Sequence, residues 1–299
     1  MQYTKKHEAP GNDNGKPSSR LSFLYQFDSL DEMADHADTA AAMPGNGEKA
    51  KQTGDAEFKG TYTFKEAHTL ATRGWAQGRA NMADCLSKGA RTLNVTHRAA
   101  WLDVAGAFPI VPVAVSGDPL CMMTIGETDR ATRPIIRLVV SRGALSCVTC
   151  EAIESRGAAI LAWVDKLESE GARVEILCVH STQEYAGKQT YTCAWNVKRA
   201  HEPLDIDRAA FSIVHTAAQR RISWAIMDAT AGVGDNSTWM SSRGQSCDWI
   251  DDEIMVPASV YFPRLKDDDG YETPQKAVAT ITAIIEAGLD TGERMEGQD

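Results

Sequence analysis

Residue types that can support covalent catalysis stand directly after short apolar segments of this sequence. Ser141, His180 and Asp228 each follow a hydrophobic run that is typical of a buried strand. Open α/β sheets bind ligands beyond the carboxyl ends of their strands, and these three types serve as nucleophile, base and orienting group in hydrolases. No Gly-x-Ser-x-Gly turn is present to expose a strained serine. Hydrolysis by Ser141 or Ser146 is therefore an alternative reading, beside that of ordinary polar loop residues.

The stretch from residue 232 to residue 249 combines large aromatic side chains with Ser, Gly and Asp. Aromatic residues on an exposed loop are typical anchors for a partner, whereas the same residues turned inward would cover the end of the sheet. The leading hypothesis is a non-enzymatic protein that binds a protein partner through its strand-end loops. The residues predicted for this surface are Ser141, Arg142, Ser146, His180, Ser181, Asp228, Trp239 and Trp249.

Basic residues also lie close to Trp195 and Trp224. This combination is found on surfaces that bind single-stranded nucleic acids, although tryptophans in apolar segments more often pack in a core. Residues 248–299 carry 13 Asp/Glu against 4 Lys/Arg, and that negative charge would repel a phosphate backbone. The second hypothesis is a nucleic-acid-binding accessory factor. It would use Lys198, Arg199, Arg220 and Arg221.

Seven cysteines are spaced irregularly along the chain. An odd number without a regular spacing is typical of reduced, mostly buried thiols in a reducing compartment. Cys147 and Cys150 form a single Cys-x-x-Cys motif, and a zinc ion would need a second ligand pair that the sequence lacks. We therefore expect buried structural thiols, no metal ion and no cofactor.

The segments that must position these residues alternate between strands and helices. Apolar residues recur at helical spacing between residues 160 and 167, and Gly171 ends that helix. Predicted core strands cover residues 135–140, 173–179, 222–227 and 256–262, with an edge strand at 190–198; predicted helices cover about 151–170, 205–217 and the segment after Pro274. The fold class is α/β: a three-layer, Rossmann-like domain with a mostly parallel sheet, preceded by a small helical region.

The N-terminal region is less regular. Thr63 and Glu66 form a capping box that predicts a helix start, and a second helix is expected over residues 77–87. Residues 101–123 predict an ordered covering loop, because they are rich in Pro, Gly and small apolar residues. We divide the chain into a disordered tail (1–20), a mainly helical and loop region packing on the core (21–132), the α/β domain (133–290) and a second disordered tail (291–299).

Composition bounds the class of protein. The chain has 299 residues, of which 43% are hydrophobic and 24% charged, and this excludes a wholly disordered or fibrous chain. No apolar run reaches the roughly 18–20 residues that span a bilayer. The N-terminus has no apolar core after its lysines, so it does not read as a secretory signal. The sequence predicts a soluble protein of the cytoplasm.

The order of these elements resembles that of a von Willebrand factor A-like (vWA-like) domain. That resemblance implies a Mg²⁺ site of the kind called MIDAS, built from Asp-x-Ser-x-Ser after the first strand, a threonine and a later aspartate. Here the first turn begins Ser141-Arg142-Gly143, so its aspartate is absent and an arginine takes part instead. Asp228 matches the later aspartate, and Ser181 or Thr182 the second loop. The resemblance thus implies a vWA-like scaffold with a degenerate metal site.

Three further segments resemble an uncharacterised phage-associated family. They are residues 108–112 (FPIVP), 117–119 (GDP), and 60–61 with 74–78 (GT…GWAQG). This resemblance covers about residues 23–290 and implies a bacteriophage protein that acts in the host cytoplasm. Its partner would be a viral or host protein, and the nucleic-acid alternative would be a factor of viral replication or transcription.

Overall fold

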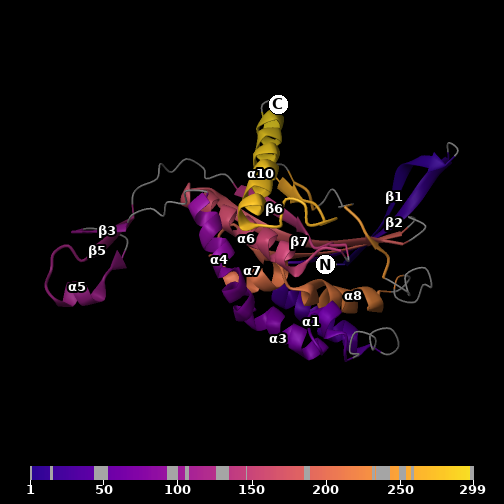
Figure 1. The fold of residues 1–299 in the computed structure, drawn as a ribbon, viewed down its shortest axis with the longest axis horizontal. Coiled ribbons are helices and arrows are strands. Elements are labelled where there is room, and N and C mark those ends of the chain that lie inside the picture. The colour runs from indigo at the N-terminus through magenta and orange to yellow at the C-terminus, as the bar shows by residue number, and fades with distance from the viewer. Residues whose placement is uncertain are drawn as a thin grey trace.

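A seven-stranded mixed sheet forms the centre of the molecule (Figure 1). The computed structural model describes residues 2–13, 16–43, 53–92, 100–104, 108–125, 135–145, 147–184, 189–230, 233, 243–248, 254–256 and 259–296. The strands run in the order β1 (Gln2–Asp13), β2 (Lys16–Phe27), β8 (Gln189–Lys198), β7 (Arg173–Gln183), β6 (Ile135–Ser141) and β10 (Ser259–Phe262), and β9 (Gln245–Ser246) pairs with the end of β7.

Three of the four pairings in the centre of the sheet are parallel. β2 pairs with β8, β6 with β7, and β10 with β6 in parallel, whereas β7 and β8 are antiparallel. The predicted fold class, an α/β protein with a mostly parallel sheet, is confirmed. Because β6 and β7 run in parallel with Ser141 beside Val179, their carboxyl ends meet at one edge of the sheet.

Helix α6 (Cys150–Ser169) connects β6 to β7. Thr149 caps its start by accepting a hydrogen bond from the Ala152 backbone N–H, and Gly171, the predicted end, follows it with a φ of 102°. The buried stripe of the helix carries the apolar residues expected from their spacing, and also Arg156. Arg156 lines the pocket that is described below.

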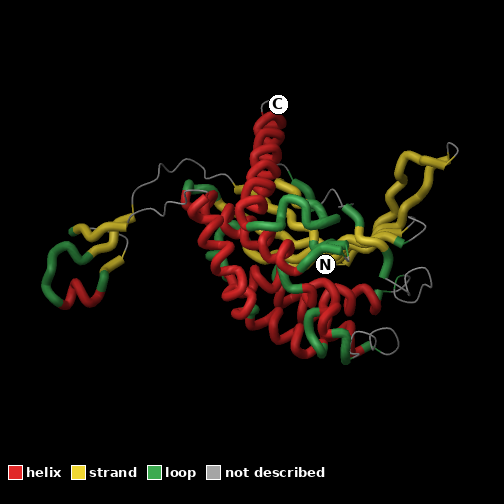
Figure 2. Tube along the Cα trace, viewed as in Figure 1, coloured by secondary structure: helices red, strands yellow, loops and turns green. Residues whose placement is uncertain are grey.

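The helices beside the sheet are shown in red in Figure 2. They are α1 (Leu30–Ala42), α2 (Ala56–Lys59), α3 (Phe64–Arg73), α4 (Ala76–Thr92), α7 (Ile206–Ile213), the π-helix η2 (Ala218–Ser223), α8 (Trp224–Ala229) and α10 (Pro274–Glu296). The capping box of Thr63 and Glu66 is present at the start of α3. Asp205 caps α7, accepting from the N–H groups of Asp207 and Arg208.

The two faces of the sheet pack differently. Leu138, Val140 and Ile176 point into a large core shared with the helices. Val139, Leu177 and Val179 point the other way, into a smaller cluster that includes Ile254 and Tyr261. Alternation along β6 and β7 therefore decides which face each polar residue at the strand ends occupies.

Two of the expected strands differ from the structure. Residues 222–227 are helical, in η2 and α8, because Ile222, Ala225 and Ile226 recur at helical spacing on one buried face. A short apolar run does not distinguish a buried strand from a buried helix. The expected edge strand at 190–198 lies inside the sheet as β8, because β2 pairs with its outer side.

The N- and C-terminal segments and residues 101–123 also depart from expectation. Strands β1 and β2 occupy the predicted tail 1–20, so the sheet recruits a strand from outside residues 133–290. Helix α10 continues through most of the predicted tail 291–299. Residues 100–125 contain a small sheet of β3 (Ala100–Asp103), β5 (Met122–Ile125) and β4 (Phe108–Pro109), with α5 (Val111–Val115), at the left of Figure 1.

Candidate functional site: an arginine-lined cleft at the strand ends

A pocket of ≈ 600 Å³ lies directly beyond the carboxyl end of β6. It is bordered by the turn after β6, the start of α6, helix α2, the segment leading into η2, and Leu265 after β10. A second pocket of ≈ 660 Å³ extends beyond the end of β7 and shares Phe58, Leu145 and Arg220 with the first. We call the two together the strand-end cleft. Its position is the one at which open α/β sheets bind ligands.

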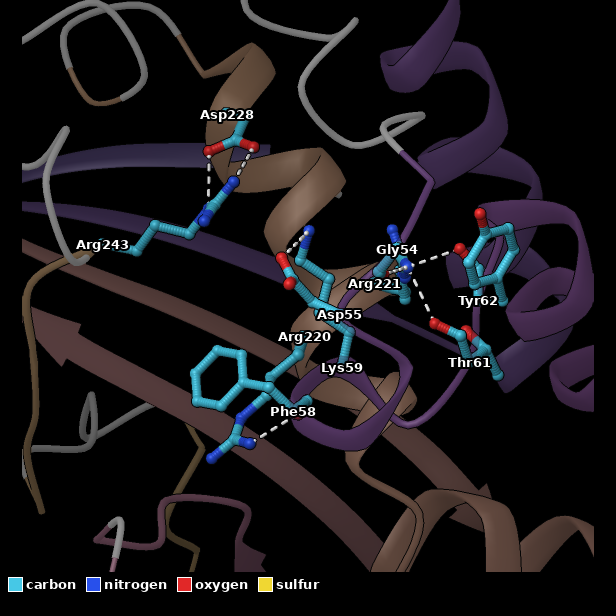
Figure 3. Close-up of polar contacts among 10 residues, drawn as sticks. All are labelled: Gly54, Asp55, Phe58, Lys59, Thr61, Tyr62, Arg220, Arg221, Asp228 and Arg243. Carbon is cyan, nitrogen blue, oxygen red and sulfur yellow. Dashed lines mark hydrogen bonds and ion pairs between the residues drawn. The ribbon is translucent and has the colours of Figure 1, made fainter.

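Two neighbouring arginines of η2 hold α2 and the residues that flank it (Figure 3). The Arg221 guanidinium donates to the carbonyl oxygens of Gly54, Thr61 and Tyr62, at 2.8, 2.7 and 2.9 Å. Arg220 donates to the Phe58 carbonyl at 2.6 Å and stacks over the Phe58 ring at 4.0 Å. These contacts fix residues 54–62, of which residues 55–58 line the cleft.

Arg142 and Arg156 hold the floor of the first pocket. Arg142 donates to the carbonyl oxygens of Ile213 and His215, at the end of α7. Arg156 donates to the carbonyl oxygens that follow β6 and β10, those of Ser141, Phe262 and Pro263. Both guanidinium groups also have a buried Nε without a hydrogen-bond partner among the described residues.

The positive charges of the floor repel one another. Burial, which disfavours the charged form, lowers the pKa of Arg142 to about 10, and the charges of Arg156 and Arg220 lower it as well. Burial lowers the pKa of Arg156 in the same way. A guanidinium group keeps its proton in proteins, so the pocket carries fixed positive charge.

His180 lies at the end of β7 on the wall of the second pocket. Its Nδ1 is 2.8 Å from the Ser223 hydroxyl, and its buried Nε2 has no partner in the described part of the chain. Burial lowers the pKa of His180 to about 3, and the charges of Arg142 and Arg220 contribute. The ring is therefore neutral at physiological pH.

The candidate catalytic residues are not brought together. Ser141 and Ser181 lie on the sheet face of Val139 and Val179, whereas His180 lies on the opposite face. The Ser141 hydroxyl accepts from the Gly143 N–H at 3.4 Å, and the Ser181 hydroxyl is 3.1 Å from that of Thr192. No Ser-His dyad forms at Ser141.

Asp228 forms an ion pair with Arg243. Its two carboxylate oxygens accept from Arg243 Nε at 3.0 Å and Nη2 at 2.9 Å (Figure 3). Arg243 at the same time stacks on the Trp224 ring at 4.4 Å, on the wall of the second pocket. Ser146, Trp239 and Trp249, the remaining residues of the predicted surface, lie outside the described residues.

The four basic residues of the nucleic-acid hypothesis do not share one surface. Lys198 is buried, with its ammonium 2.6 Å from Glu168 and 2.9 Å from the Val174 carbonyl oxygen. Arg199 pairs with Asp28 at 3.6 Å, away from the cleft. Arg221 is buried against the carbonyls described above, and Trp195 lies in the core, which leaves Arg220 at the cleft.

The residues that the vWA-like resemblance assigns to Mg²⁺ do not fit that ion. Arg142 donates to carbonyls where the first carboxylate would stand, and the Asp228 carboxylate is occupied by Arg243. No group of three or more His, Cys, Asp or Glu residues suited to a metal is found among the residues described. A hard cation needs oxygen ligands, and this end of the sheet presents guanidinium groups.

The cysteines depart in part from expectation. Cys178, Cys193 and Cys247 are buried, and burial raises the pKa of the Cys178 and Cys193 thiols to about 12. Cys147 and Cys150 are exposed instead, because they lie at the start of α6, before its buried stripe begins.

Two contributors to the cleft were missed from the sequence. Arg156 lies four residues before Ile160 and so continues the apolar stripe of α6, which is a signal that could have been noticed. Phe58 is far away in the chain from the strands and carries no such signal. Its place on Arg220 depends on the folding of residues 54–62.

These features define a mixed α/β protein with a mostly parallel central sheet and an arginine-lined cleft at its strand ends. The chain belongs to the DUF7192 family, a domain of unknown function whose profile matches residues 12–287. Comparison with curated proteins and with solved structures gave no match. Within the described residues, every helix is too short or too polar to cross a membrane.

Proposed function

We propose that this chain is a non-enzymatic binding protein whose strand-end cleft takes up an anionic group of a protein partner. One observation carries the proposal: Arg142, Arg156 and Arg220 converge on one pocket from three different elements. No described carboxylate lies within ion-pair distance of any of them. Buried charges that lack a protein counter-ion are suited to an anion from outside.

The arrangement of the candidate catalytic groups supports binding over hydrolysis. A serine nucleophile needs a base within hydrogen-bond distance and access to a substrate. Ser141 is 2% exposed, and its side chain and that of His180 point to opposite faces of the sheet. Ser223 does contact His180, but it is fully buried, so a substrate carbonyl has no route to it.

The proposal also includes the vWA-like type of the fold and the phage origin of the protein. The order of β6, α6, β7 and β8 supports the vWA-like resemblance, with β10 taking the place of the strand expected at residues 222–227. On this reading the metal site is degenerate, and an arginine pocket occupies the end of the sheet. The phage association and a cytoplasmic location, with a viral or host partner, are proposed on the sequence resemblance alone.

The test is a tagged pulldown from cells that express the protein in its native genetic context, with half of each lysate treated with nuclease. Three baits are compared: the unmodified chain, Arg220→Ala and the matched control Arg199→Ala. We expect one protein to be captured by the unmodified chain and by Arg199→Ala in both halves, and lost with Arg220→Ala. Capture that does not depend on Arg220 would overturn the proposal. Capture that needs both nucleic acid and Arg199 would instead favour the nucleic-acid hypothesis.

A further inference from the structure

The first pocket of the strand-end cleft combines a positive floor with an apolar wall. Arg142, Arg156 and Arg220 line it together with Phe58, Leu145 and Leu265. Two acids, Asp55 and Glu57, lie at its α2 side, and Asp55 is 3.4 Å from Lys59. The pocket lining therefore holds three guanidinium groups against two carboxylates, one of which is paired with Lys59.

The three arginines play different parts. Arg142 and Arg156 are 6% and 4% exposed, and each donates to backbone carbonyl oxygens. They supply fixed charge at short range in a site of low dielectric, where such charge acts strongly. Arg220 is half-buried and uses one Nη1–H for the Phe58 carbonyl. Among the described residues its other N–H groups have no hydrogen-bond partner, and its guanidinium stacks on the Phe58 ring at 4.0 Å.

The number of charges indicates which anion suits the pocket. A carboxylate carries one charge and two oxygens, and a single arginine satisfies it. A phosphate monoester carries close to two charges and three acceptor oxygens, which suits several guanidinium groups. A pocket of ≈ 600 Å³ also has room for an organic body beyond the phosphate, and Phe58, Leu145 and Leu265 offer that body an apolar contact.

We propose that this pocket binds a phosphate monoester, with Arg220 in direct contact with the phosphate oxygens and Arg142 and Arg156 supplying the charge behind it. The proposal rests on the proposed function, whose anionic group it specifies. The phosphate belongs either to a modified side chain of the protein partner or to a free phosphate ester. The chemistry at the pocket is the same in both cases.

The direct test is isothermal titration of the full chain with phenyl phosphate, inorganic phosphate and benzoate at about pH 8, where the ester is a dianion. We expect phenyl phosphate to bind at least about tenfold more tightly than benzoate. Arg220→Ala should lose about tenfold or more of that affinity, Arg220→Lys less, and the control Arg199→Ala none. Arg221 still anchors residues 54–62 in the Arg220 variants, and a circular dichroism melt checks that they fold.

The absence of binding by both phosphate probes would overturn the proposal, as would equal affinity for benzoate or unchanged affinity in Arg220→Ala. The source of the phosphate is found by repeating the pulldown from phosphatase-treated lysate. Loss of the partner places the phosphate on the partner. If the partner is retained but phenyl phosphate displaces it, the partner occupies the pocket without a phosphate, and the phosphate ligand is a free ester. If the partner is retained and phenyl phosphate does not displace it, the result contradicts the proposal. If phenyl phosphate binds but no Arg220-dependent partner is found, the pocket stands and the protein-partner proposal fails.

Discussion

The molecule holds its buried or half-buried cations in two ways. Lys198 and Arg243 each face a carboxylate, Glu168 at 2.6 Å and Asp228 at 2.9 Å. Among the described residues, Arg142 and Arg156 have no carboxylate partner: both donate to backbone carbonyl oxygens, and Arg156 also contacts the neutral side chain of Tyr271. A carbonyl dipole satisfies N–H groups without neutralising their charge. The charges of Lys198 and Arg243 are therefore neutralised by a carboxylate, whereas those of Arg142 and Arg156 are not. The difference separates cations that complete the fold from cations that also prepare a pocket for an anion.

The comparison predicts its largest effect at Arg156. Arg156→Met keeps much of the side-chain volume but leaves the carbonyl oxygens of Ser141, Phe262 and Pro263 without their donor. We expect the free energy of unfolding to fall by about 3 kcal/mol, since several buried acceptors lose their partner. Urea denaturation followed by circular dichroism measures it. A loss below about 1 kcal/mol would mean that Arg156 serves only the pocket.

A carboxylate-paired cation should show a somewhat smaller effect when its partner is neutralised. Glu168→Gln removes the counter-ion of Lys198, whose side chain is 1% exposed, but the Val174 and Arg199 carbonyl oxygens still accept from the ammonium. We expect a loss of about 2 kcal/mol in the same urea assay. The matched control is Glu170→Gln, which removes the more exposed ion pair with Lys166 and should cost less than about 0.5 kcal/mol. Equal losses in the two variants would contradict the distinction.

The burial of His180, close to the charges of Arg142 and Arg220, also predicts a pH effect on stability. Burial, together with Arg142 and Arg220, lowers its pKa from 6.5 to about 3. The unfolded chain therefore takes up a proton below pH 6.5 that the folded chain does not, and stability falls as pH decreases. His180→Gln should reduce the difference in unfolding free energy between about pH 7 and about pH 5 by about 2 kcal/mol. The exposed control His201→Gln should leave that difference as it is, and the same result for both variants would contradict a His180 ring that is held neutral by burial.

The sequence predicted the scaffold better than the cleft, and particular residues show why. The capping box at Thr63 and the buried stripe of α6 are local patterns, and local patterns fix helices. Residues 222–227 form an apolar run so short that it fits both a buried strand and a buried helix, and only packing in the folded protein decides between the two. Arg142 and Asp228 were expected as exposed binding residues, yet each is bound to a group that lies far away in the chain or in a loop. Such contacts depend on the assembled fold, so no spacing rule indicates them.

The smallest predicted effect links the two groups of cations. Asp228→Asn leaves the Arg243 guanidinium stacked on Trp224 but removes its counter-charge. A cation on the wall of the second pocket that was paired with a carboxylate then has none. Because the two pockets adjoin at Arg220, the added potential should strengthen phenyl phosphate binding by about threefold, and salt should weaken the gain. Titration calorimetry at low and high ionic strength measures it, with Glu170→Gln as a control of equal charge change far from the cleft. If both variants change the affinity equally, the net charge of the chain is responsible. The presence or absence of a carboxylate beside a particular arginine would then not explain anion binding in the pocket.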